Sequence, residues 1–244
     1  MQKYFISNEE LNNNHIISDD VNHIKNVMRF KQGDQIIVSN EEDEYIACLT
    51  VLDKKEIKFE RLTRLENNNE LPFTVDIYQG YPKGDKIQDI IKHGTELGAT
   101  SIFPTIMKRS VVKLDNTKEE LKNIRLNKIA KEAAEQSNRK KITKVCIKPN
   151  LKKIDFSEYN VKILAYEETA KKGQLSNLKA LIKNIKLNDK VCIVVGPEGG
   201  LDLDEVSYLE GLGFVPCALG KRILRTETAS LYALSAISYE LELK

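Results

Sequence analysis

The 244-residue sequence contains no tryptophan, three methionines, three histidines and four cysteines. The cysteines form no CxxC pair and the histidines form no HExxH-like cluster, so their spacing predicts neither disulfides nor a metal site. No apolar run reaches the roughly 18 residues of a membrane span. The first residues, MQKYFISNEE, lack the apolar stretch of a secretion signal. We therefore expect a cytoplasmic protein without a structural metal.

The common phosphate-binding motifs are also missing, since neither GxGxxG nor GxxxxGK[ST] occurs. The net charge of +2 is unevenly distributed. Residues 1–70 carry 9 Lys and Arg against 14 Asp and Glu, whereas residues 71–140 carry 13 against 9 and residues 141–244 carry 16 against 13. A nucleic-acid partner is therefore permitted by charge but not indicated by it.

Short apolar or alternating runs fill the first part of the chain, at residues 35–38, 45–52 and 57–62. Polar turn-like stretches separate them, which predicts a small antiparallel β unit, with one short helix before it near residues 19–28. Residues 66–70, ENNNE, have no apolar side chain and are typical of a linker.

After residue 71 the pattern alternates between strand and helix, which predicts an α/β domain with a largely parallel sheet. The expected strands are 75–79, 101–106, 161–165, 191–195 and 214–219. The expected helices are 85–97, a long one ending near 137, one around 178–185, 204–212 and 227–243.

Two of these strands end in glycine loops. Residues 191–195 run into GPEGG at 196–200, and residues 214–219 run into Gly220 and KRILR. Glycine allows sharp turns and close approach of a ligand to the backbone. Because the carboxyl ends of parallel strands share one edge of a sheet, we expect the two loops to form the walls of one pocket.

Apolar side chains in the second loop lie next to backbone amides, which suits a flat, neutral, hydrogen-bonding ligand such as adenine. Arg222 and Arg225 are available for an anionic partner, and Thr226 is expected to cap the final helix through its hydroxyl. A solvated surface pair is the alternative interpretation of Lys221 and Arg222.

Cations elsewhere are open to two interpretations. Gln136 and Arg139, at the end of the long helix, can contact bases and phosphates, but Lys140 and Lys141 can equally be cations that favour the helix dipole. Lys25 and Arg29 in the first part could touch phosphates, or they could belong to a scattered solvated surface.

Several motifs together resemble the RsmE family, which are SPOUT-superfamily methyltransferases that modify N3 of a uridine in bacterial 16S ribosomal RNA of the small subunit. The resemblance covers most of the chain in order. The motifs are HIKNVMR at 23–29, KGD at 83–85, TELG at 95–98, RSVV at 109–112, EAAEQS at 132–137, GPEGG at 196–200 and LGKRILRTETA at 219–229. The last two in combination are the most specific.

The resemblance implies a PUA-like β-barrel domain for RNA binding at 1–70 and a SPOUT domain with a trefoil knot at 71–244. It also implies S-adenosylmethionine (SAM) as methyl donor, and a homodimer that completes each active site. The expected partners are therefore 16S ribosomal RNA, or the small ribosomal subunit, and a second copy of the chain, with no membrane and no metal.

The expected site residues fall into three groups, of which the cofactor-binding residues are those that the resemblance implies. The cofactor-binding residues are Leu164, Ala165, Val195, Gly196, Pro197, Glu198, Gly199, Leu219, Gly220, Ile223, Leu224 and Arg225. The catalytic candidates are Arg225, Glu198, Glu227 and Arg139 (from the partner subunit). The candidate RNA-binding residues are Lys25, Arg29, Lys108, Arg109, Gln136, Arg139 and Arg222.

The expected chemistry is set by the acceptor, because N3 of uridine is a poor nucleophile until its proton leaves. We expect Glu198 or Glu227 to take or relay that proton, and Arg225 or Arg139 to stabilise the anion. A ribose 2′-O-methyltransferase on the same scaffold and a non-catalytic RNA-binding assembly factor remain as alternatives.

Overall fold

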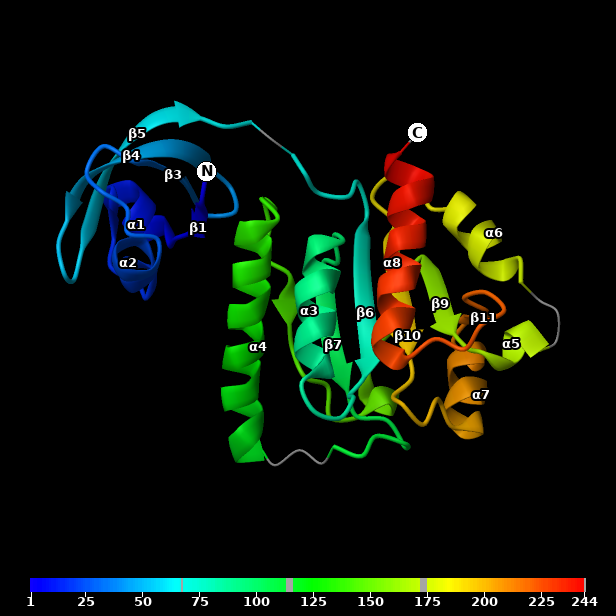
Figure 1. Cartoon of the computed structure of the whole chain (residues 1–244). Helices are drawn as coiled ribbons and strands as arrows, with labels where there is room; N and C mark the ends of the chain where they lie inside the picture. The colour runs from blue at the N-terminus through cyan, green and yellow to red at the C-terminus, as the bar shows by residue number, and fades with distance from the viewer. Residues whose placement is uncertain (67, 113–115, 172–174, 244) are drawn as a thin grey trace. The chain divides into compact units, whose positions relative to one another are not determined.

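A computed structural model describes residues 1–66, 68–112, 116–171 and 175–243 (Figure 1). The chain divides into two compact units. The first comprises Met1–Glu70 together with Ala134–Ile142, and the second comprises Leu71–Ala133 and Thr143–Lys244. The return of Ala134–Ile142 to the first unit is not part of the sequence prediction.

The first unit is built on a five-stranded sheet with the order β1-β3-β4-β5-β2. Its strands are β1 (Lys3–Phe5), β2 (His15–Ile16), β3 (Gln35–Ser39), β4 (Glu44–Leu52) and β5 (Ile57–Arg64). β1 pairs parallel with β3, and the other pairs are antiparallel. The predictions for β3, β4 and β5 are confirmed. β1 and β2 were not predicted, because two or three residues are too few to show an alternating pattern.

The helices of this unit are α1 (Asn8–Asn13), α2 (Asp20–Asn22) and a π-helix, His23–Val27. The helix predicted at 19–28 is therefore present, but its second half is wound as a π-helix. One sign of the wider turn is the Met28 amide, which donates to the carbonyl of His23, five residues earlier. π-helices are rare and tend to occur at functional sites.

A buried polar cluster connects the two sequence segments of the first unit. The ammonium of Lys3, a fully buried residue, forms an ion pair with Glu44 and donates to the carbonyl oxygen of Arg139 at 2.6 Å. The amide of Phe5 donates to Glu135 Oε1 at 2.9 Å. These contacts hold β1 and β4 against the segment Ala134–Ile142.

The second unit contains a six-stranded sheet with the order β11-β9-β10-β6-β7-β8, in which every pair is parallel. Its strands are β6 (Thr74–Gly80), β7 (Ser101–Thr105), β8 (Lys144–Val145), β9 (Val161–Ala165), β10 (Lys190–Val195) and β11 (Val215–Cys217). Its helices are α3 (Lys86–Glu96), α4 (Asn116–Gln136), the 3-10 turn Leu151–Lys153, α5 (Glu168–Lys171), α6 (Asn177–Lys183), α7 (Leu203–Gly211) and α8 (Thr226–Glu242). The predicted alternation of strand and helix is confirmed.

Both faces of this sheet are covered, which explains the continuous apolar runs of its central strands. On one face, Tyr78, Val194 and Leu164 pack with residues of α7 in a single apolar cluster. On the other face, α3 and α8 lie side by side (Figure 1). An added Cβ on Gly94 of α3 would lie 2.8 Å from Ile102 Cδ1, so the end of that side chain would have to shift to admit it.

The carboxyl group of Asp76 is partly buried within this sheet. Asp76 of β6 accepts a hydrogen bond from the Tyr159 hydroxyl at 2.7 Å, and that hydroxyl lies 3.1 Å from the hydroxyl of Tyr78. Burial raises the pKa of Asp76 and outweighs the hydrogen bond from Tyr159, which lowers it. The ionised carboxylate is therefore less favourable in the folded protein than in the unfolded chain.

This burial predicts a pH-dependent stability. The contribution of Asp76 is complete below the ordinary Asp value of 3.8 and is lost as the pH rises through the raised pKa. The substitution Asp76→Asn removes the titratable carboxyl group and keeps an oxygen that can accept the hydrogen bond from Tyr159. We expect the difference in unfolding free energy between the variant and wild type to shift in favour of the variant as the pH rises, by about 1.4 kcal/mol for each unit of pKa shift. Chemical denaturation at a series of pH values measures this, and parallel stability curves would contradict it.

Candidate functional site

The candidate site is formed where three neighbouring strands of the second unit end. β9 lies between β10 and β11, and its last residue, Ala165, is in register with Val195 of β10 and with Cys217 of β11. The loop at 196–202 and the loop at 218–225 therefore leave the sheet on the two sides of Ala165. The expected proximity of the two glycine loops is confirmed.

Thr226 connects the second loop to the first. Its hydroxyl donates to the carbonyl oxygen of Gly196 at 2.6 Å and accepts from Gln79 Nε2 at 2.7 Å. The prediction that Thr226 caps the last helix is wrong, because Arg225 occupies the N-cap position and no side chain caps α8. The single proton of the hydroxyl is directed to Gly196, so Thr226 fixes one loop against the other.

Close backbone packing explains the glycines at the start of the first loop. A Cβ on Gly80 would lie 2.3 Å from the nitrogen of Pro197 and 2.7 Å from the carbonyl carbon of Gly196. A Cβ on Gly196 would lie 2.9 Å from the backbone of Gly200. The end of β6 and the GPEGG loop can therefore approach each other only because side chains are absent.

Glu198, at the tip of this loop, is held by two donors. Its Oε1 accepts from the backbone amide of Lys83 at 3.0 Å and from the Lys86 ammonium at 2.9 Å. Burial raises the pKa of Glu198, but the hydrogen bonds from Lys86 and the backbone outweigh it, so the net pKa lies below the usual value. Glu198 is thus an ionised acceptor of hydrogen bonds.

Lys86 also faces the second candidate carboxylate. Its Nζ lies 3.7 Å from Oε2 of Glu227, in the first turn of α8. The hydrogen bond to Glu198 raises the pKa of Lys86 above its ordinary value, so its ammonium stays protonated. Sequence analysis did not select Lys86, although it directly follows the KGD motif at 83–85. No sequence signal could have found it, because its proximity to the glycine loop is visible only in the folded chain.

Lys108 and Arg109, predicted to bind RNA, pair with acidic side chains beside the first loop. The Lys108 ammonium lies 2.7 Å from Asp202 Oδ1 and 3.1 Å from Asp204 Oδ2. Arg109 donates to the carbonyl oxygen of Gly199 at 3.0 Å and lies 3.6 Å from Asp202. Both side chains are about half exposed. In this arrangement they brace the loop at 196–202, and contact with RNA remains a proposal.

The second loop presents unpaired backbone and apolar surface. Among the described residues, the amides of 219–224 donate no hydrogen bond within the protein. Gly220 has a φ of +107°, and the side chain of Ile223 is 74% exposed. Arg222 and Arg225 are also exposed. Such a loop can give donors and an apolar contact to a planar ligand.

The predicted cofactor residues lie together on these two loops and the adjoining strand ends. Leu164 and Val195 are buried in the sheet, so they can border the site through their backbone. Pro197 is buried against Gly80, whereas Glu198 and Gly199 are exposed. The strand predicted at 214–219 is shorter, since β11 ends at Cys217 and leaves Leu219 in the loop.

The predicted RNA-binding residues of the first unit differ in exposure. Lys25 is half-buried and donates to the carbonyl oxygen of Leu52 at 3.2 Å. Arg29 is exposed, directly after the π-helix, with a φ of +56°. Gln136 is exposed at the end of α4.

Arg139 is placed differently from the other RNA-binding candidates. Its side chain is 5% exposed and forms an ion pair with Glu70, with Arg139 Nε 3.3 Å from Glu70 Oε1. Glu70 Oε1 also accepts from the amides of Lys140 and Lys141. The segment predicted as a linker thus ends in a carboxylate that organises residues 139–141. A direct catalytic role for Arg139 would require it to leave this ion pair.

The described part of the chain contains neither a cluster of metal-ligating side chains nor a helix that could span a membrane. His, Cys, Asp and Glu side chains form no group of three there that could hold a metal ion. Every helix in those ranges is too short or too polar to cross a lipid bilayer.

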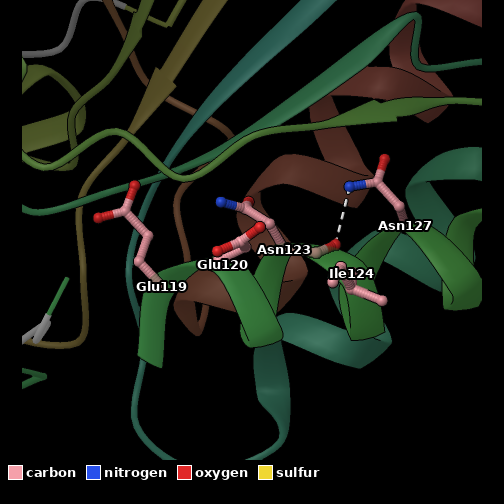
Figure 2. A pocket seen from close by; sticks show the side chains of 5 residues that line it. All are labelled: Glu119, Glu120, Asn123, Ile124 and Asn127. Atoms are coloured by element: carbon pink, nitrogen blue, oxygen red, sulfur yellow. Dashed lines mark hydrogen bonds between the residues drawn. The ribbon is translucent and has the colours of Figure 1, made fainter. Parts of the chain in front are cut away.

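A separate open pocket lies on α4, lined by Glu119, Glu120, Asn123, Ile124 and Asn127 (Figure 2). Asn127 exchanges hydrogen bonds with the backbone of Val145 in β8, and Asn123 Oδ1 accepts from the amide of Ile147. Because β8 and β11 are opposite edges of the sheet, this pocket is distinct from the candidate site. The side-chain amides that line the pocket are therefore already hydrogen-bonded to the backbone at this edge of the sheet.

Comparison with protein families finds two matches in the order expected. An RNA methyltransferase domain matches residues 69–238, and an RNA methyltransferase PUA domain matches residues 16–60.

Individual proteins are similar over the whole chain. The ribosomal RNA small subunit methyltransferase E of Bacillus subtilis (strain 168) is 43% identical, with 100% of this chain and 98% of that protein covered. The crystal structure of ribosomal RNA small subunit methyltransferase E from Neisseria gonorrhoeae bound to SAM has a TM-score of 0.81, 27% identity and 98% coverage of both chains. A further crystal structure, of a hypothetical protein, has a TM-score of 0.89 and 40% identity, with 99% of both chains covered.

Proposed function

The chain belongs to the RsmE family of ribosomal RNA small subunit methyltransferases, and from this premise we propose that it methylates N3 of a uridine in 16S ribosomal RNA with SAM as donor. Family membership supports methylation of ribosomal RNA, and the position on the base is our proposal. The observation that carries the proposed SAM site is the register of Ala165 with Val195 and Cys217, which brings two glycine loops together at one sheet edge.

The residues of this edge fit SAM. The unpaired amides of 219–224 suit the polar edge of adenine, and the exposed side chain of Ile223 suits its face. The matching structure from Neisseria gonorrhoeae was determined with SAM bound, which supports the same ligand here. Residues 164–165, 195–199 and 219–225 would hold it.

SAM supplies a methyl group on a positively charged sulfur, so the donor needs no activation by the protein. The protein must instead bind the uracil ring and remove the N3 proton. Glu198 and Glu227 are the candidate proton acceptors, and both face Lys86 at the start of α3. Arg225, exposed at the N-cap of α8, is the proposed residue for stabilising the uracil anion.

RNA binding is proposed for cations of both units, with the half-buried Lys25 and the exposed Arg29 on the first and the exposed Arg222 on the second. We further propose that the protein acts as a homodimer with a trefoil-knotted second unit, as the family resemblance implies. Lys108 and Arg109 would contact RNA only through the faces that their acidic partners leave exposed.

The test is methylation of purified small ribosomal subunits that lack the modification, with labelled SAM as donor. RNase digestion and mass spectrometry of the nucleosides identify the product. We expect N3-methyluridine at a single nucleotide. A ribose-methylated nucleoside would favour 2′-O chemistry, and SAM binding without any transfer would favour a non-catalytic RNA-binding factor.

Arg225→Ala provides a more specific prediction. Because the guanidinium is proposed to stabilise charge that develops during the reaction, its loss should lower turnover by about 100-fold and change SAM affinity much less. Single-turnover rates and calorimetric SAM binding measure the two quantities. Arg222→Ala, on the same loop, is the matched control and should mainly weaken RNA binding. Equal turnover of Arg225→Ala and wild type would contradict the assignment.

A further inference from the structure

Two carboxylates and one ammonium form a compact cluster at the mouth of the candidate site. Lys86 Nζ lies 2.9 Å from Glu198 Oε1 and 3.7 Å from Glu227 Oε2. The three residues come from the start of α3, the GPEGG loop and the first turn of α8. The two candidate proton acceptors therefore differ in how each meets the same cation.

Glu198 is already fully engaged at the oxygen that faces Lys86. Oε1 accepts hydrogen bonds from the Lys83 amide and from the Lys86 ammonium, so both of its lone pairs are used within the protein. An acceptor held by two donors binds a proton weakly, which makes Glu198 a poor base.

Glu227 differs at the atom level. Its Oε2 is buried and accepts no hydrogen bond from the described residues. A buried carboxylate oxygen without a donor is costly unless a ligand supplies one. Lys86, at 3.7 Å, supplies charge but not a hydrogen bond. Arg225, which begins α8, and Glu198, beyond Lys86, are the other charged groups of this cluster.

On the basis of the proposed function, we propose that Glu227 Oε2 receives the N3 proton of the uridine and that Lys86, which lies beside both Glu227 and Glu198, is the positioning residue that orients the Glu227 carboxylate. Glu198 acts through Lys86, because it fixes the ammonium between the two carboxylates. Glu227 also lies in the first turn of α8, where the helix dipole favours a negative charge.

The N3–H bond breaks and its proton passes to Glu227 Oε2, while the electron pair stays on the nitrogen. That pair forms the new N–CH₃ bond, and the pair of the broken C–S bond remains on the sulfur of the donor. Glu227 then releases its proton to solvent through its exposed side, because its side chain is 21% exposed.

The experiment is the pH dependence of single-turnover methylation, measured on small ribosomal subunits between about pH 5 and 9 with the full-length protein. Glu227→Gln should lower the rate about 100-fold or more, and Glu198→Gln should lower it less. In Lys86→Met, the acid limb of the profile should move to higher pH, because the proton-accepting carboxylate loses a nearby cation.

Two variants control for charge and folding. Lys86→Arg keeps the cation and should keep the acid limb near the wild-type position. Lys92→Met removes an exposed cation from the same helix and should leave the profile unchanged. SAM binding and thermal unfolding of each variant complete the set, because a purely structural role of Lys86 would change those two quantities without moving the acid limb.

The outcomes separate this inference from the proposed function. If wild type makes N3-methyluridine but Glu227→Gln retains its rate, or the acid limb stays in place in Lys86→Met, the inference is overturned and the proposed function stands. If wild type makes a different product or none, the proposed function itself fails.

Discussion

Lys3→Met is expected to destabilise the first unit by about 3–5 kcal/mol, because it leaves the carboxylate of Glu44 buried without its cation. Lys3 is fully buried, and its ammonium serves both Glu44 and the carbonyl oxygen of Arg139. Methionine fills a similar volume, so the loss comes from charge rather than from a cavity. Urea denaturation followed by circular dichroism measures the unfolding free energy.

The double variant Lys3→Met/Glu44→Gln is the control. Removing both charges avoids the unpaired carboxylate, so the double variant should recover much of the stability lost in Lys3→Met. Lys54→Met, which changes an exposed lysine of the same unit, should stay within about 0.5 kcal/mol of wild type. A Lys3→Met protein as stable as wild type would show that the ion pair does not support the fold.

Gly80→Ala should weaken cofactor binding at the candidate site. The new Cβ would lie 2.3 Å from the nitrogen of Pro197, and backbone atoms cannot move aside as the end of a flexible side chain can. The GPEGG loop must therefore shift, which breaks the Thr226 hydrogen bond to Gly196 and displaces Glu198 from Lys86. We expect at least tenfold weaker SAM binding and a loss of stability of about 1–3 kcal/mol.

Gly211→Ala is the matched substitution for this test. Gly211 is the last residue of α7, and an added Cβ meets no atom within 4 Å. The alanine should bind SAM as wild type does and fold with equal or slightly greater stability. Calorimetric titration of both variants with SAM decides the question, and wild-type affinity in Gly80→Ala would remove the steric argument for this glycine.

The α/β architecture and the meeting of the two loops were predictable because they depend on local patterns. Apolar runs ending in glycine mark the predicted strands 191–195 and 214–219, and parallel strands necessarily place their carboxyl ends at one edge. The buried cysteines of these strands follow the same rule, since Cys192 and Cys217 pack as small apolar residues.

Side-chain pairings across long sequence distances were not predictable. Nothing in the sequence around Lys86 distinguishes it from Lys83 or Lys92, and only the folded chain shows its contact with Glu198, 112 residues away. Arg139 and Glu70 pair over 69 residues for the same reason. The role of Thr226 was misjudged because its helix-start position suits a cap, whereas the approach of Gly196 offers its hydroxyl a different acceptor.

The two asparagines of α4 have a consequence for the solution behaviour of the protein. The side-chain amides of Asn123 and Asn127 form hydrogen bonds with backbone groups of Val145 and Ile147. These bonds take the place of those that a further strand would make. A β-strand from another molecule could add at this border only by breaking those bonds. A helix thus terminates the sheet and protects it against intermolecular β-aggregation.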